Sequence, residues 1–197
     1  SVFGYLTDGC NAAGAWLAGA VPHRGTGGVT EDVVTGMNLA EMNKAKLAAC
    51  LLVNIEPDTD ALDAKALMAS LADTDFVVSI SSYNSASLKQ VADVLLPAAA
   101  FTETSGTYVN AEGFWQSFKG AVEPKGEARP AWKILRVLGN LTGAGEFEYM
   151  SSDEVKAEVR SQCESIQLSN DIQGGVTVDS TTSSDLFSAT SVPMYAE

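Results

Sequence analysis

The sequence predicts an α/β fold with a parallel sheet and βαβ crossovers. Three short apolar runs of strand length follow one another between residues 49 and 97, and two segments of helical spacing separate them. The first run, over residues 49–55, is almost continuously apolar, which is typical of a parallel strand that is covered on both faces. Strands and helices that alternate in this way favour right-handed crossovers within one sheet.

Each element of this sheet has its own local signal. The first apolar run covers residues 49–55 and ends at Glu56 and Pro57. Apolar residues between 60 and 72 recur at helical spacing and predict a short amphipathic helix. A strand, a helix and a strand that Pro97 ends are then expected over residues 76–82, 85–91 and 93–97.

The segment before the sheet is rich in Gly and Ala and predicts a short helix followed by a loop. Asn11 is expected to cap this helix, which carries Trp16 and Leu17, and Pro22 is expected to end it. The following residues 25–28, Gly-Thr-Gly-Gly, do not match a phosphate-binding loop, because no Lys follows them.

The segment after the sheet predicts a loop with a hairpin and then two helices. The loop and hairpin cover residues 102–119. The first helix is expected over residues 129–139, with Pro130 in its first turn and Gly139 past its end. The second is expected over residues 152–164, capped by Ser151 or Ser152.

The composition is that of a soluble globular chain with an acidic surface. The 197 residues include 12 Lys and Arg and 25 Asp and Glu, which gives a net charge of −13. Such a surface repels nucleic acid and anionic membranes. We expect no transmembrane span and no secretory signal, because no apolar run approaches the ~20 residues of a span and residues 1–9 carry no basic group. The absence of an initial Met predicts a piece of a longer protein.

The sequence offers few residues for catalysis or metal binding. Cys10, Cys50 and Cys163 form no C-x-x-C pair, so we expect reduced, mostly buried thiols rather than a metal site or a disulfide framework. His23 is the only imidazole, and a structural or exposed role is expected for it. No residue is predicted to be catalytic or to ligate a metal.

The polar loop after the third strand is the most specific stretch of the chain. It follows the carboxyl end of a predicted parallel strand, where open α/β sheets bind ligands. Its candidate cofactor-binding residues are Glu103, Thr107, Asn110 and Gln116. The same side chains could instead hydrogen-bond the loop to itself and to a neighbouring domain, and composition does not decide between these interpretations.

Several strings of the chain resemble the large subunit of the peripheral arm of bacterial NADH:quinone oxidoreductase, respiratory complex I. They cover residues 11–24, 92–97, 101–118, 126–140 and 192–196. The C-terminal region of that large subunit is similar to the molybdopterin oxidoreductases, such as formate dehydrogenase and DMSO reductase. The resemblance implies a partial α/β domain of this type over residues 1–165. A Ser/Thr-rich, loop-like tail that docks back through its apolar end is expected over residues 166–197.

The resemblance also implies a function. It implies a non-catalytic scaffold domain of the peripheral arm, in a subunit whose iron–sulfur clusters lie in other segments and pass electrons from NADH toward quinone. No cofactor is then expected in this segment. The implied partners are other peripheral-arm subunits and the N-terminal, cluster-binding part of the same subunit. The implied location is cytoplasmic, peripheral to the inner membrane.

One departure from the family pattern bears on the loop. The family usually has Arg after Glu-Gly, whereas this chain has Phe114, which cannot clamp a phosphate or carboxylate. One alternative is a fragment of a molybdenum or tungsten bis-pterin oxidoreductase that holds its cofactor with residues 102–116. Another is an independent protein-binding module. We further expect Phe114, Trp115 and Phe118 to form an exposed aromatic patch that promotes self-association.

Overall fold

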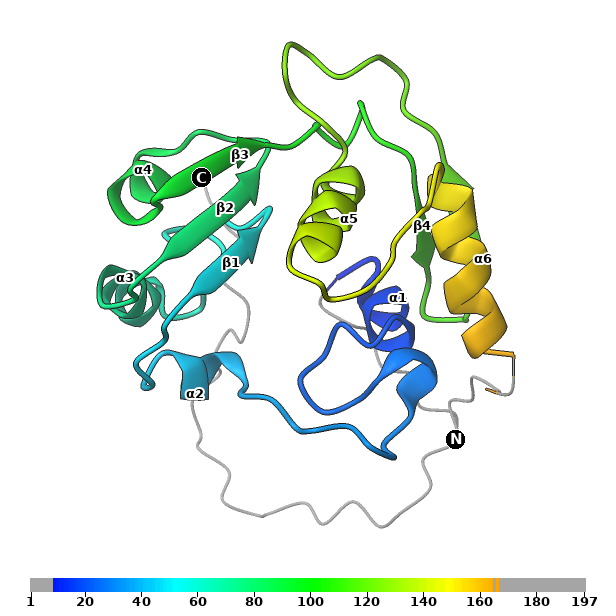
Figure 1. Cartoon of the computed structure of the whole chain (residues 1–197), viewed down its shortest axis with the longest axis horizontal. Helices are drawn as coiled ribbons and strands as arrows, with labels where there is room; N and C mark the ends of the chain where they lie inside the picture. Colours follow the sequence, from blue (N-terminus) through cyan, green and yellow to red (C-terminus); the bar gives the residue numbers. More distant parts are fainter. Residues whose placement is uncertain (1–8, 165, 167–197) are drawn as a thin grey trace, which may run out of the picture.

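The computed structural model describes residues 9–164 and 166 and contains the predicted parallel sheet (Figure 1). Strands β1 (Cys50–Val53), β2 (Val77–Ser81) and β3 (Val94–Pro97) pair in parallel in the order β1-β2-β3. Helices α3 (Ala64–Ala72) and α4 (Ala86–Val91) connect them. The α/β fold class and all five elements of this unit are therefore confirmed.

Helices α3 and α4 cover one face of the sheet and form the larger core with it. Each helix begins at a capping side chain, since Asp63 accepts from the N–H of Ala66 at 2.9 Å and Ser85 accepts from the N–H of Leu88 at 3.3 Å. Apolar side chains of both layers meet in this core: Leu52, Ala61, Leu67, Leu71, Val77 and Leu88. The amphipathic pattern that predicted the helices is the pattern that buries them.

The other face of the sheet is only partly covered, so the expectation of two covered faces is wrong. Ile80 points away from α3 and α4 and is fully buried, and helix α5 (Ala131–Leu141) contacts its strand. At the edges of the sheet, however, Leu51 is 48% exposed and Val94 is 37% exposed. One helix that crosses near β2 is too narrow to cover three strands.

A second unit is built around the hairpin of β4 (Gly106–Val109) and β5 (Trp115–Phe118). Helix α1 (Ala12–Leu17) and helix α6 (Ser152–Gln162) pack against this hairpin. A short 3₁₀ turn, η1 (Thr26–Gly28), contacts both helices. The core of this unit contains Leu17, Val109 and Cys163, with Trp115 and Val159 packed against it. The predicted hairpin is confirmed. The predicted helix that precedes the sheet in the sequence (α1) and the two that follow it (α5 and α6) are confirmed as well.

Two local predictions about these helices are wrong. Asn11 does not cap α1 with its side chain, because its Oδ1 accepts from the N–H of Val109 at 2.8 Å and so ties α1 to β4. Gly139 lies inside α5, which continues to Leu141. A Cβ at Gly139 would lie 2.5 Å from the ring of Phe147, so this glycine allows a close approach rather than ending the helix.

The structure adds one helix and corrects the expectation about the cysteines. Helix α2 (Leu39–Met42) has no counterpart among the predicted elements, although Asn38 and Glu41 form a complete capping box at its start. Of the three thiols only Cys163 is buried, while Cys10 is exposed and Cys50 is half-buried, so the expectation of mostly buried cysteines is wrong.

Two expectations concern the whole chain: the absence of a transmembrane span and the division into a domain and a tail. Within the described part of the chain, no helix has the length and apolar character that crossing a membrane requires. The expected tail over residues 166–197 lies outside the described residues except for Ile166. The domain boundary at residue 165 therefore stays a prediction.

Candidate functional site

The turn of the β4–β5 hairpin is held by one of the four candidate side chains. Asn110 Oδ1 accepts from the N–H groups of Glu112 and Phe114 at 3.0 and 2.9 Å. The backbone then turns at Gly113, whose φ of 83° lies in the left-handed region. Asn110 therefore forms an Asx-type turn that closes the hairpin.

The two candidates on the strands of the hairpin differ in their surroundings. Thr107 on β4 lies opposite Ser117 on β5, and the two hydroxyl oxygens are 2.9 Å apart. Gln116 on β5 lies opposite Tyr108, and its side chain is exposed. The hairpin thus uses Thr107 in a cross-strand pair and presents Gln116 to solvent.

Glu103 shapes the segment that leads from the sheet to the hairpin. Its Oε2 accepts from the N–H of Ala100 at 3.1 Å, and the N–H of Glu103 donates to the carbonyl of Ala100 at 2.8 Å. The neighbouring Ala99 donates to the carbonyl of Arg129 at 2.8 Å, which ties this segment to the start of α5. Three of the four candidates therefore hydrogen-bond the loop to itself.

Two cavities lie at the carboxyl ends of the strands, where the position of the loop predicted a ligand site. The first, of about 400 Å³, is lined by Ser81, Ser82 and Asn84 together with Glu103. The second, of about 340 Å³, is lined by Asn54 and the same two serines. Lys125 is the one cation that borders either of them within the described residues. The lining of each cavity is more apolar than polar and provides little positive charge.

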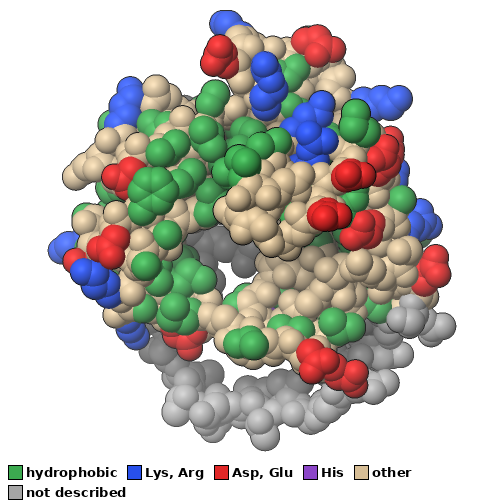
Figure 2. All heavy atoms as spheres, in the orientation of Figure 1, with side chains coloured by type: hydrophobic (Ala, Val, Ile, Leu, Met, Phe, Trp, Pro, Cys, Tyr) green, Lys and Arg blue, Asp and Glu red, His purple; other side chains and the backbone are tan. Residues whose placement is uncertain are grey.

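A larger cavity, of about 690 Å³, lies between the hairpin and the first turns of α5 and α6. Its cationic lining residues are Lys119, Arg129 and Lys133. Figure 2 shows several Lys and Arg side chains, with Asp and Glu side chains among them, at the upper end of this face of the molecule, where Figure 1 shows the loop above α5. The sequence alone does not indicate this cavity, because its cations are spread over the chain without a recognisable spacing.

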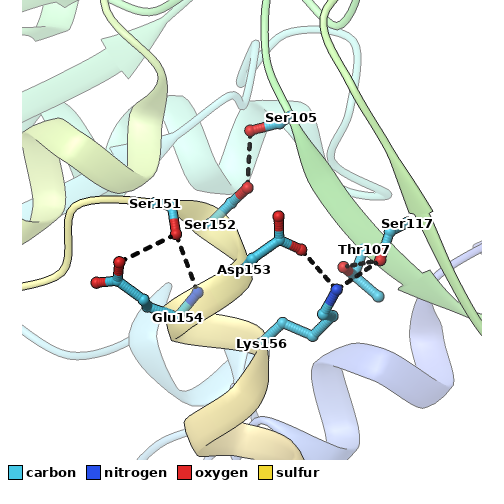
Figure 3. Close-up of polar contacts among 8 residues, drawn as sticks. All are labelled: Ser105, Thr107, Ser117, Ser151, Ser152, Asp153, Glu154 and Lys156. Atoms are coloured by element: carbon cyan, nitrogen blue, oxygen red, sulfur yellow. Dashed lines mark hydrogen bonds and ion pairs between the residues drawn. The ribbon is translucent and has the colours of Figure 1, made fainter.

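A network of hydroxyl groups and one ion pair joins the hairpin to the start of α6 (Figure 3). The hydroxyl oxygens of Ser105 and Ser152 are 2.7 Å apart. Lys156 Nζ donates to Ser117 Oγ at 3.1 Å and to Asp153 Oδ1 at 2.6 Å. This hydrogen bond from Lys156, assisted by its charge and that of Lys119, lowers the pKa of Asp153. The charge of Lys119 therefore acts at the start of α6.

The remaining expectations concern the aromatic residues. Phe114 is 63% exposed, whereas Trp115 packs against the core of the hairpin unit. Phe118 meets Tyr108 edge to face, with ring centroids 5.0 Å apart. The expected patch of three exposed aromatic residues is therefore wrong, and only Phe114 of the three is exposed.

The described residues contain no cluster of three or more His, Cys, Asp or Glu side chains that could hold a metal ion. His23 is exposed in the loop after α1. Cys50 and Cys163 are far apart in the fold, on β1 and in the core of the hairpin unit. Burial raises the pKa of both thiols, which keeps them protonated.

Comparison with known proteins places the chain in a family. The sequence profile of the molybdopterin oxidoreductase family matches residues 8–141. The chain belongs to this family.

Its relatives include subunits of complex I and other oxidoreductases. It is 53% identical over 53 residues to the mitochondrial NADH-ubiquinone oxidoreductase 78 kDa subunit of Candida albicans, covering 27% of the chain and 7% of that protein. It is 34% identical over 136 residues to the mitochondrial NADH dehydrogenase [ubiquinone] iron-sulfur protein 1 of Solanum tuberosum, covering 64% of the chain and 18% of that protein. A nitrate reductase of Symbiobacterium thermophilum is 36% identical over 125 residues, covering 61% of the chain and 16% of that protein.

These matches confirm the predicted resemblance to the complex I large subunit. The chain spans less than a fifth of the length of these relatives, from 7% to 18%.

The polar loop does not fit the pterin cofactor that the family name implies. The Glu103 carboxylate and the Asn110 amide oxygen accept hydrogen bonds from backbone groups of the loop itself. Phe114, in the position where a guanidinium could bind phosphate, presents an exposed ring. We therefore derive no chemical step through such a cofactor at this loop.

Proposed function

We propose that the chain is a non-catalytic scaffold domain of a complex I large subunit, in the peripheral arm. In this role it packs against the cluster-binding part of the same subunit and against other peripheral-arm subunits. The parent protein's iron–sulfur clusters, in other segments, carry electrons from NADH toward quinone. The chain itself holds no cofactor and acts on the cytoplasmic side, peripheral to the inner membrane.

One observation carries this proposal: the polar side chains of the loop are used to build the loop. Asn110 closes the hairpin, Thr107 pairs with Ser117, and Glu103 fixes the turn at Ala100. In a cofactor site these groups would be free to bind the ligand. Their internal hydrogen bonds support a structural role for the loop.

The open faces of the fold support the same role. Leu51 and Val94 leave one face of the sheet partly exposed, and Leu141 at the end of α5 is 78% exposed. Apolar surface of this kind favours packing against another protein surface. The relatives named as complex I subunits support that assembly as the partner.

Native electrophoresis of extracts from the source organism tests the proposal. An antibody against the chain should detect it in a large assembly that also stains for NADH dehydrogenase activity. Detection of the chain only as a small free species, with the activity band elsewhere, contradicts the scaffold role. Denaturing electrophoresis of the same band gives the size of the polypeptide that contains the chain.

A second candidate is a cofactor-holding fragment of a molybdenum or tungsten bis-pterin oxidoreductase. It is favoured by the two cavities at the carboxyl ends of the strands and by the relative named as nitrate reductase. This candidate predicts that the chain binds guanosine monophosphate, and that Glu103→Ala or Asn110→Ala abolishes the calorimetric signal in variants that remain folded. The scaffold role predicts that neither substitution changes the heat that the titration gives.

A further inference from the structure

We propose that the cavity between the hairpin, α5 and α6 binds a phosphate-bearing small molecule through Lys119, Arg129 and Lys133. This site goes beyond the scaffold role and does not depend on it. It also lies apart from the cavities at the carboxyl ends of the strands, because none of these three cations lines either of those.

None of the three cations forms a direct ion pair among residues 9–164 and 166, although the charge of Lys119 also acts on Asp153. The ion pairs of this part of the chain join Lys46 to Asp75 and Lys156 to Asp153. Arg129 donates only to the carbonyl groups of its own loop, at Gly126 and Ala128. Three carboxylates, those of Glu103, Glu123 and Asp153, also line the cavity, but none of them forms a direct ion pair with these cations, which can therefore still bind an anionic ligand.

Two helices also begin at this cavity. Pro130 and Trp132 of the first turn of α5 line it, as do Ser151 and Ser152 at the start of α6. Each of these helices has 11 residues, and Figure 1 shows that both begin at the upper end of the molecule. No side chain caps α5. At α5 the free N–H groups and the positive end of the helix dipole therefore add to the attraction for an anion, whereas at α6 the cap of Ser151 and the acidic residues Asp153 and Glu154 offset this contribution.

Neutral donors complete the lining. Ser105 and Ser152 share one hydrogen bond, so one of their two hydroxyl protons remains available (Figure 3). The indole Nε1 of Trp132 is buried and has no hydrogen-bond partner within the described residues. A buried N–H without a partner is costly, and an acceptor oxygen of a ligand would satisfy it.

The acidic residues at the cavity limit the kind of anion that fits. Glu103 accepts from the backbone at Ala100, and Asp153 is paired with Lys156 at 2.6 Å, so neither forms a direct ion pair with the three cations, although both keep their negative charge. Glu123 also lines the cavity and is exposed. These carboxylates repel a chain of phosphates. The volume of about 690 Å³ and the side chains of Phe118 and Val122 leave room for an organic group. A single phosphate ester fits this combination best.

Calorimetric and NMR titrations of the purified chain test the site. The probes are inorganic phosphate and glycerol 3-phosphate, each at constant ionic strength set with NaCl. We expect saturable binding and shifts of backbone amide signals at the first turns of α5 and α6. Lys119→Gln and Lys133→Gln should each weaken binding about tenfold, the effect of losing one charge-assisted hydrogen bond.

Lys65→Gln is the matched control, because Lys65 is an exposed lysine on α3 and lines none of the three cavities described above. Tighter binding of the ester than of inorganic phosphate assigns the site to an organic phosphate, and equal binding assigns it to the free ion. Shifts that grow linearly without saturation overturn the proposal. It is also overturned if Lys65→Gln weakens binding as much as Lys133→Gln does. The circular dichroism spectrum of each variant shows whether it is folded.

Discussion

Substitution of Asn110 by Ala separates a structural role of the polar loop from a ligand-binding role. The change removes an amide oxygen that accepts from the N–H groups of Glu112 and Phe114, at 3.0 and 2.9 Å. Each such bond contributes about 1 kcal/mol to stability. Because the turn is partly open to water, we expect a total loss of about 1–2 kcal/mol, which lowers the melting temperature by about 2–8 °C in a chain of this size.

Urea unfolding followed by circular dichroism measures this loss. Asn110→Asp keeps an acceptor oxygen in the same place and should retain most of the stability. Asn84→Ala is the matched control, because Asn84 is exposed and its side chain makes no hydrogen bond within the described residues. We expect the control to stay within about 0.5 kcal/mol of the unmodified chain. If Asn110→Ala unfolds like the unmodified chain, the reasoning that the loop is built by its own polar groups is refuted.

Burial and charge lead to three further predictions. Leu88→Ala removes a fully buried side chain and should lower the free energy of unfolding in urea by about 2–5 kcal/mol. Leu62→Ala, at a position that is 69% exposed, should change this free energy by less than about 0.5 kcal/mol. Lys156 lowers the pKa of Asp153, so the stabilising effect of this ion pair is present above the pKa of Asp153 in the unfolded chain and is lost as the pH falls through its pKa in the folded chain. Lys156→Met should therefore raise the pKa of Asp153 in an NMR titration, and an unchanged pKa contradicts the assignment. Cys10 is exposed and should react with a thiol reagent in the folded chain faster than Cys50 and Cys163 do. Equal reaction rates for the three cysteines would contradict the burial described above.

The fold could be predicted where the signal is local. The apolar runs that became β1, β2 and β3 and the helical spacing of α3 depend on neighbouring residues in the sequence, and each formed the expected element. The cap at Ser151 also follows a local rule, since its side chain accepts from the N–H of Glu154.

Predictions failed where a distant contact decides the outcome. Asn11 has the residue type of a helix cap, but its side chain bonds to Val109, 98 positions along the chain. The exposure of Leu51 depends on how much of the sheet α5 covers, which no local pattern contains.

The candidate site was predicted in position but not in detail. The loop does follow the carboxyl end of β3, and Glu103 lines a cavity there. Which side chains face a ligand and which bond to the loop depends on the turn at Gly113 and on the hairpin register, and these appear only in the folded structure. The sequence does not predict the cavity lined by Lys119 and Lys133, because these two lysines come together only in the folded chain.

Metal analysis of a polypeptide limited to residues 1–197, produced in a host that assembles iron–sulfur clusters and molybdenum cofactors and then desalted, tests the central claim most directly. That claim is that this segment provides no side-chain set for a redox centre. Iron, molybdenum and tungsten are then expected at the level of the buffer. One equivalent of any of these metals retained by the chain would contradict the claim.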